Sequence, residues 1–140
     1  MQAGPTPEPD WRPPHAYVPG LTPRHPEDLF DPLKAVVGGI APDQLHQSSL
    51  WRFAFDFLDE GYFWEAHELL EAIWLACPPN SAQKLVVQAV IQFANASLKA
   101  RMGRNNAVAR LMVEADRLWA DGFVRADGKV FDFSNSDKPW

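Results

Sequence analysis

The sequence predicts an all-α protein, an antiparallel bundle of about four helices with a proline-rich N-terminal arm packed on its surface. Apolar side chains recur every three to four residues through residues 43–122, the period of a helix with one buried face. Ten of the thirteen prolines fall in residues 1–42, where they disfavour regular helix or sheet. We therefore divide the chain into an arm (1–42), a helical bundle (43–122) and a C-terminal tail (123–140).

The arm carries more large apolar side chains than a disordered linker usually holds. They include Trp11, Tyr17, Val18, Phe30 and Leu33. Because leaving this surface in water would give up the free energy of its burial, we expect the arm from about Trp11 onward to pack across the folded body.

The first two helices are expected on either side of Gly61. Asp43 can cap the first helix, and Gly61 ends it. The second helix covers about residues 62–76 and stops before the prolines at positions 78 and 79. The apolar face of the first helix holds Leu50, Phe53, Ala54, Phe57 and Leu58.

Two more helices complete the predicted bundle. Ser81 is expected to cap a third helix over about residues 82–102, which should be central because its polar strip is narrow. The fourth helix is expected over about residues 106–120. A short hairpin around residues 127–128 is one option for the tail.

Composition limits the classes of partner. The formal net charge is −5 and the basic residues form no cluster, so we expect no nucleic-acid partner. No apolar run is long enough to cross a bilayer, so we expect no membrane partner. The single cysteine, Cys77, and a start without the pattern of a secretory signal indicate a cytoplasmic protein. The surplus of Trp and Phe favours a homo-oligomer.

The most informative pattern is H-x-x-x-E-x-x-W on the second predicted helix, formed by His67, Glu71 and Trp74. Residues three and four apart lie on one side of a helix, so these side chains should share a face at the border of the apolar stripe. Glu65 and Glu68 fall on other positions and are expected to face water. The pattern therefore locates a candidate site without identifying a reaction.

Metal binding is one interpretation of the pair, with His67 and Glu71 as candidate ligands and candidate catalytic residues. A catalytic centre generally needs three protein ligands, and His46 is best placed to be the third, with His25 and His15 as further options. Imidazole and carboxylate ligands favour zinc, manganese, iron or nickel. Outer contacts to the ligands could come from Trp74, Gln88, Gln92 and Asn95.

Other interpretations stay open. With a metal, the protein could be a metal-dependent hydrolase acting on a small-molecule substrate that the sequence does not identify. Without one, His67 and Glu71 could work as an acid–base couple. Alternatively, His67, Glu71 and Trp74 could form a buried hydrogen-bonded network, which would make the protein a non-catalytic structural or interaction module.

Several segments together resemble a known family. They are GYFWEAHELLEAIW at residues 61–74, QAVIQ at residues 88–92 and the stretch from Asn106 to Leu111. In combination they are similar to the widespread prokaryotic family called domain of unknown function 309, and the similarity covers about residues 46–120.

The arm adds to this resemblance, because YVPGLTPRHP at residues 17–26 is similar to the proline-rich lead-in of longer family members. The resemblance implies a small all-helical fold. It also implies a metal site at the positions of His67 and Glu71, but it implies no known reaction.

Overall fold

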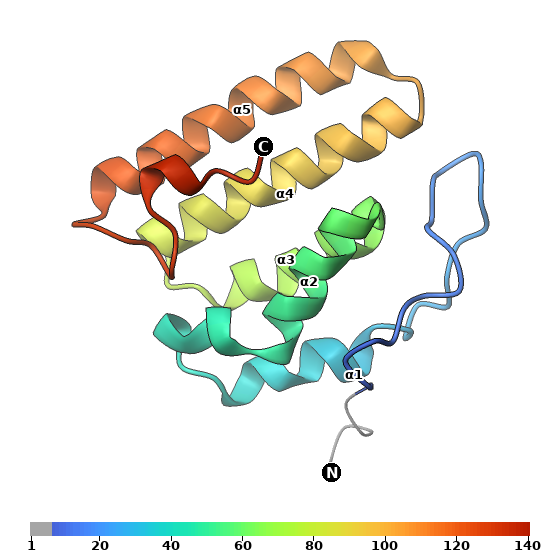
Figure 1. Ribbon diagram of the computed structural model, residues 1–140, viewed down its shortest axis with the longest axis horizontal. Helices are drawn as coiled ribbons and strands as arrows, with labels where there is room; N and C mark the ends of the chain where they lie inside the picture. The colour runs from blue at the N-terminus through green and yellow to red at the C-terminus, as the bar shows by residue number, and fades with distance from the viewer. Residues whose placement is uncertain (1–6) are drawn as a thin grey trace.

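The computed structural model describes residues 7–140, so the first six residues of the predicted arm lie outside the described part. Within that part the chain is all-α, as predicted, and its one β feature is an isolated bridge between Val130 and Phe133. The α-helices, shown in Figure 1, are α1 (Asp31–Lys34), α2 (Ser49–Glu60), α3 (Phe63–Ala76), α4 (Ala82–Arg101) and α5 (Asn105–Arg125). Short 3₁₀ helices are η1 (Ala35–Gly39), η2 (Pro42–Gln47) and η3 (Asn135–Asp137).

Consecutive helices pack in chain order, α2 on α3, α3 on α4 and α4 on α5. The long helices α4 and α5 form an antiparallel hairpin along one side of the molecule (Figure 1). Helices α2 and α5 make little direct contact. The four helices therefore do not close into the antiparallel bundle that the sequence predicted.

The C-terminal tail supplies a physical reason for the open arrangement. Phe133 contacts Trp51 of α2 and Trp119 of α5, with ring centroids 5.9 and 5.4 Å apart, respectively. The indole N–H of Trp119 donates to the carbonyl of Asn135 at 2.9 Å. Aromatic side chains of the tail thus fill space that direct contact between α2 and α5 would otherwise occupy.

The start of the first long helix differs from the prediction. Ser48 caps α2, and its hydroxyl accepts from the backbone N–H of Trp51 at 3.1 Å. Asp43 instead lies within η2, so its prediction as the cap was wrong. The extended backbone of Ser48 separates the two segments. Gly61 ends α2 as predicted, with a φ of 89° that favours glycine.

Helix α4 begins at the predicted cap, since Ser81 accepts from the N–H of Lys84. Helix α5 runs to Arg125, past the predicted end at residue 120. Gly122 lies inside α5, where an added Cβ would come within 2.8 Å of the Val86 side chain. This glycine permits close packing of α4 and α5, and it does not terminate the helix.

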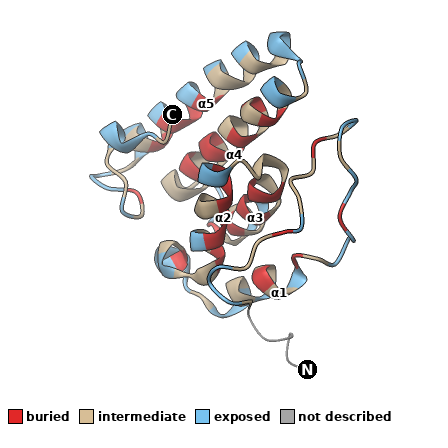
Figure 2. Ribbon diagram, turned by 45° about the vertical axis from the view of Figure 1, so that its right-hand side comes forward, coloured by how far each residue is buried: buried red, intermediate tan, exposed pale blue. Residues whose placement is uncertain are grey.

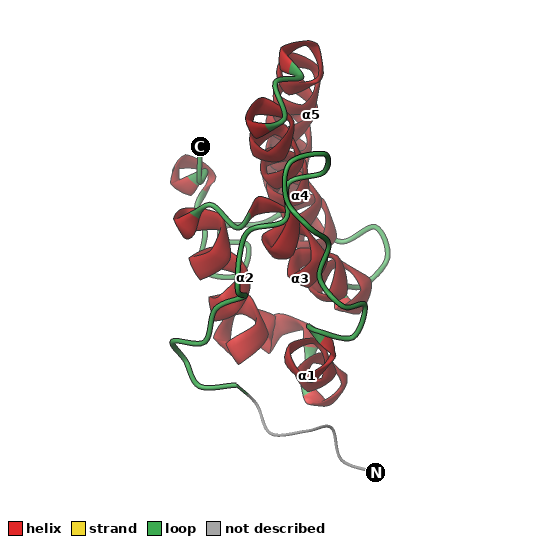
Figure 3. Ribbon diagram, turned by 90° about the vertical axis from the view of Figure 1, so that its right-hand side faces the viewer, coloured by secondary structure: helices red, strands yellow, loops and turns green. Residues whose placement is uncertain are grey.

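Much of the arm is a long loop that lies beside α2 and α3 (Figure 3). Val18, Phe30 and Leu33 are buried, and buried segments are visible within the loop in Figure 2. Trp11 packs against Phe57 of α2, with ring centroids 6.3 Å apart. The arm therefore covers faces of the body that would otherwise be exposed.

The hydrophobic core lies among α2, α3 and α4. Its largest fully buried side chains from these helices include Phe53, Phe57, Leu69, Leu70, Ile73, Val86 and Val90. Within residues 7–140, no helix has the length and apolar character required to cross a membrane.

Candidate functional site on helix α3

His67 and Glu71 lie one turn apart on α3, and they share a face as the sequence predicted. The Nε2 atom of His67 is 2.7 Å from Oε1 of Glu71. The His67 side chain is 21% exposed and that of Glu71 is 50% exposed. The pair is therefore accessible from solvent, because α3 presents it at the edge of its buried face.

The two ring nitrogens of His67 have different surroundings. Nδ1 is buried and has no hydrogen-bond partner within residues 7–140. Nε2 faces the carboxylate of Glu71. Because neutral imidazole binds a metal through a nitrogen lone pair, Nε2 is the atom that could act as a ligand beside Glu71.

Trp74 does not complete the hydrogen-bonded network that the sequence suggested. Within the described part of the chain, no hydrogen bond joins Trp74 to His67 or Glu71, so the pair stands without the indole. The face of the indole ring is instead covered by Lys84 of α4, whose Nζ is 3.9 Å from the ring centroid. Trp74 thus contributes a cation–π contact between α3 and α4.

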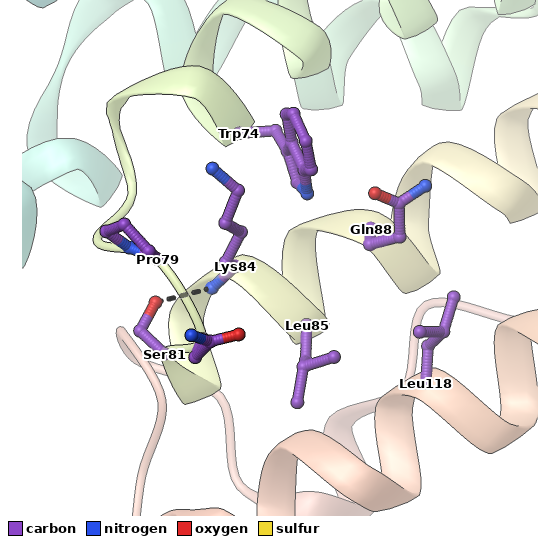
Figure 4. Close-up of a pocket in the computed structure, with 8 residues that line it drawn as sticks. Trp74, Pro79, Ser81, Lys84, Leu85, Gln88 and Leu118 are labelled. Carbon is purple, nitrogen blue, oxygen red and sulfur yellow. Dashed lines mark hydrogen bonds between the residues drawn. The ribbon is translucent and has the colours of Figure 1, made fainter.

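Trp74 also separates two adjoining hollows, each of about 340 Å³. One lies toward the start of α4 and is lined by Lys84, Leu85 and Gln88 (Figure 4). The other is lined by Glu71, Gln88 and Ile91. Concave surface therefore lies next to Glu71.

The three amides predicted as outer contacts lie on α4, and within residues 7–140 none of them hydrogen-bonds to the His67–Glu71 pair. Gln88 lines both hollows. Asn95 donates to the carboxamide oxygen of Gln92 at 3.4 Å, so these two amides pair with each other.

His46 is held on another part of the molecule. Its Nε2 is 3.5 Å from Oδ1 of Asp132 in the tail, and its ring lies against Trp51 and Phe131. Within residues 7–140, no three His, Cys, Asp or Glu side chains are grouped closely enough to hold a metal ion. His46 is therefore not brought to His67, and this chain supplies two ligands at the pair.

Glu65 does not face water, and this prediction was wrong. Its side chain is 0% exposed. The Oε2 atom lies 2.6 Å from Nε2 of His25 and accepts from the backbone N–H of Tyr17 at 2.7 Å. Glu68 is also partly covered, with Nζ of Lys34 3.2 Å away. The reason is that the arm lies across this face of α3.

The buried His25–Glu65 pair is the polar group that sequence reasoning missed. His15 lies next to it, with its ring centroid 4.6 Å from that of His25, and its Nε2 is 2.7 Å from the carbonyl of Pro23. The sequence offers His25 as a further option for the third ligand beside His67, but in the structure its partner is Glu65. The available signal was the lead-in at residues 17–26, which contains both Tyr17 and His25.

Cys77 is buried, in agreement with a packing role. Burial raises the pKa of its thiol to about 11. Its Sγ lies 3.4 Å from the carbonyl oxygen of Ile73. Since the thiolate is the reactive form, this cysteine is poorly suited to act as a nucleophile at neutral pH.

The fold and the site together define a class, a small all-α protein with an accessible His–Glu pair beside a concave α3–α4 surface. Residues 51–111 match the family model described as Domain of unknown function (DUF309), so this segment of the chain is similar to that family. Comparisons with curated proteins and with solved structures gave no match.

Proposed function

We propose that His67 and Glu71 form half of a divalent-metal site and that a second copy of the chain supplies the other half. One observation carries this proposal. Two side chains that commonly ligate metals converge to 2.7 Å on a solvent-accessible helix face. An ordinary surface pair at this spacing contributes only ~0.5 kcal/mol to stability, so the experiment must separate ion binding from simple pairing.

The donor set fits one class of ion. An imidazole nitrogen and a carboxylate oxygen suit zinc, manganese, iron and nickel. Two donors are too few for tight binding by one chain. Two copies would together provide two imidazoles and two carboxylates, which is the ligand number of a closed tetrahedral zinc site.

The surface around the pair favours a second copy as the source of the missing ligands. Leu75 follows Glu71 by one turn on α3 and is 72% exposed. Hollows adjoin it on two sides, one containing Trp74 and Ile91 and the other containing Val37 and Ile40. A prominent leucine between hollows is the kind of surface that pairing of two identical faces would bury.

In the proposed site the metal ion joins two copies of the chain and does not catalyse hydrolysis. A catalytic zinc keeps one coordination position open for water, whereas four protein ligands would fill a tetrahedral site. A metal-dependent hydrolase would require a different ligand set from the one proposed. The protein would thus act as an interaction module, in which the metal ion links two copies.

Thermal unfolding in the presence of zinc tests the proposal. Zinc at about 100 times its dissociation constant should stabilise the wild-type protein by ~2.7 kcal/mol through mass action, and a chelator should reverse this. His67→Ala and Glu71→Ala should each abolish the stabilisation.

His46→Ala is the matched control, because His46 also lies beside a carboxylate, that of Asp132. It should respond to zinc like the wild type. An equal response from His67→Ala, or loss of the response only in His46→Ala, would reject the His67–Glu71 site.

A further inference from the structure

We propose that the hollow between Trp74 and the start of α4 binds a small organic carboxylate with a flat apolar body. The hollow has a volume of about 340 Å³. Its walls include Trp74, Lys84, Leu85, Gln88 and Leu118, and Figure 4 shows these side chains around one space. This site goes beyond the proposed metal site, because it lies on the other side of Trp74 from Glu71.

Lys84 provides the charge that such a ligand requires. Its ammonium group is positioned over the ring of Trp74, 3.9 Å from the centroid. None of the ion pairs within residues 7–140 includes Lys84, although the chain has a formal net charge of −5. A positioned cation without a carboxylate partner, beside apolar walls, is a favourable contact for an anion.

Two further donors are available at the hollow. In the described part of the chain, neither the indole N–H of Trp74 nor the carboxamide of Gln88 takes part in a hydrogen bond. A carboxylate offers two oxygens with several acceptor sites. It could therefore accept from Lys84 and from one of these donors together.

The apolar walls of the hollow favour a ligand whose body, apart from its carboxylate, is apolar. The Trp74 ring, Leu85 and Leu118 come from α3, α4 and α5 respectively. The volume is near the lower end of the range for small-molecule sites, which begins at about 300 Å³. These features suit a single aromatic ring carrying a carboxylate, and benzoate is the simplest probe.

Titration with benzoate, followed by the ¹⁵N–¹H NMR signal of the Trp74 indole, tests the site. Trp74→Phe identifies the signal, which is necessary because the chain has six tryptophans. Benzoate should shift it saturably. Lys84→Met keeps the apolar stem and removes the charge, so it should weaken binding about tenfold or more.

Lys84→Arg should retain most of the binding, because it preserves the charge. Lys99→Met is the matched control, since it removes a lysine from the same helix at a position that does not line the hollow. It should bind benzoate like the wild type. Far-UV circular dichroism should show equal helix content in all these variants.

Three results would overturn the inference. They are the absence of a saturable shift, unchanged affinity in Lys84→Met, and equal affinity for benzoate and the neutral benzyl alcohol. The benzoate site and the metal site can be tested independently. His67→Ala should leave benzoate binding intact, and Lys84→Met should leave the zinc response intact.

Discussion

Glu65 has no exposed surface, and both of its close polar partners belong to the arm. His25 lies 2.6 Å from its Oε2 atom, and the N–H of Tyr17 donates to the same atom. The other oxygen, Oε1, is buried without a partner within residues 7–140. Because a buried carboxyl that loses its partners is costly, α3 and the arm depend on each other through this residue.

Glu65→Ala should lower the free energy of unfolding by about 3–5 kcal/mol, because it leaves His25 buried without its partner. Chemical denaturation measures the change. Glu68→Ala is the matched control, since its pairing with Lys34 is partly exposed and should contribute less than about 1 kcal/mol. Equal, small effects from the two substitutions would contradict the anchoring role of Glu65.

Glu71 and Glu65, both on α3, show which contacts of single residues the sequence can predict and which it cannot. Helical spacing alone was sufficient to place His67 beside Glu71, because both belong to one helix. The same spacing assigned Glu65 to solvent, because a helical period contains no information about a loop some 40 residues earlier. Helical spacing likewise contains no information about the contact that Asp132 of the tail makes with His46.

Among the contacts between elements, hydrogen bonds to Asp116 attach the C-terminal tail to α5. Its Oδ1 accepts from Nζ of Lys138 at 2.7 Å and from the indole N–H of Trp140 at 2.8 Å. The ring of Trp140 also lies against Trp119 and Phe93. These contacts connect the end of the chain to both α4 and α5.

Hydrogen bonds from Lys138 and then from Trp140 lower the pKa of Asp116 below its ordinary value of 3.8. A lowered pKa in the folded state means that the contribution to stability is present above the ordinary value and is lost as the pH falls through the folded value. Asp116→Asn should therefore be slightly less stable than the wild type at neutral pH. The difference should disappear in strong acid.

Melting curves of both proteins across this pH range provide the measurement. The effect should be small, because Asp116 is exposed and solvent screens its charge. A difference that grew as the solution became more acidic would have the wrong sign and would contradict a stabilising role for the hydrogen bonds to Asp116.

The helices themselves were largely predictable, because their caps and apolar periods are local features. Ser81 and Gly61 marked helix boundaries correctly. Gly122 does not mark the end of α5, because the helix continues through it to Arg125. A glycine is found there because the Val86 side chain of α4 approaches closely. The start of α2 was missed because both Asp43 and Ser48 are suitable caps by residue type.

At the scale of the whole molecule, the arm should be required for stability. A chain beginning at Asp43 would lack Phe30 and Leu33, whose burial is worth ~1.5–3 kcal/mol each. It should melt at a clearly lower temperature or fail to fold. Leu21→Ser is the control, because Leu21 is an exposed side chain of the arm. An unchanged melting curve for the truncated chain would contradict the packing of the arm.

Native mass spectrometry of the zinc-loaded protein shows whether two copies are joined by an ion at His67 and Glu71. We expect a dimer that holds one zinc ion, and we expect His67→Ala to remain a zinc-free monomer under the same conditions. A zinc-free wild-type protein, or a monomer that binds its own zinc ion, would contradict a metal site shared between two copies.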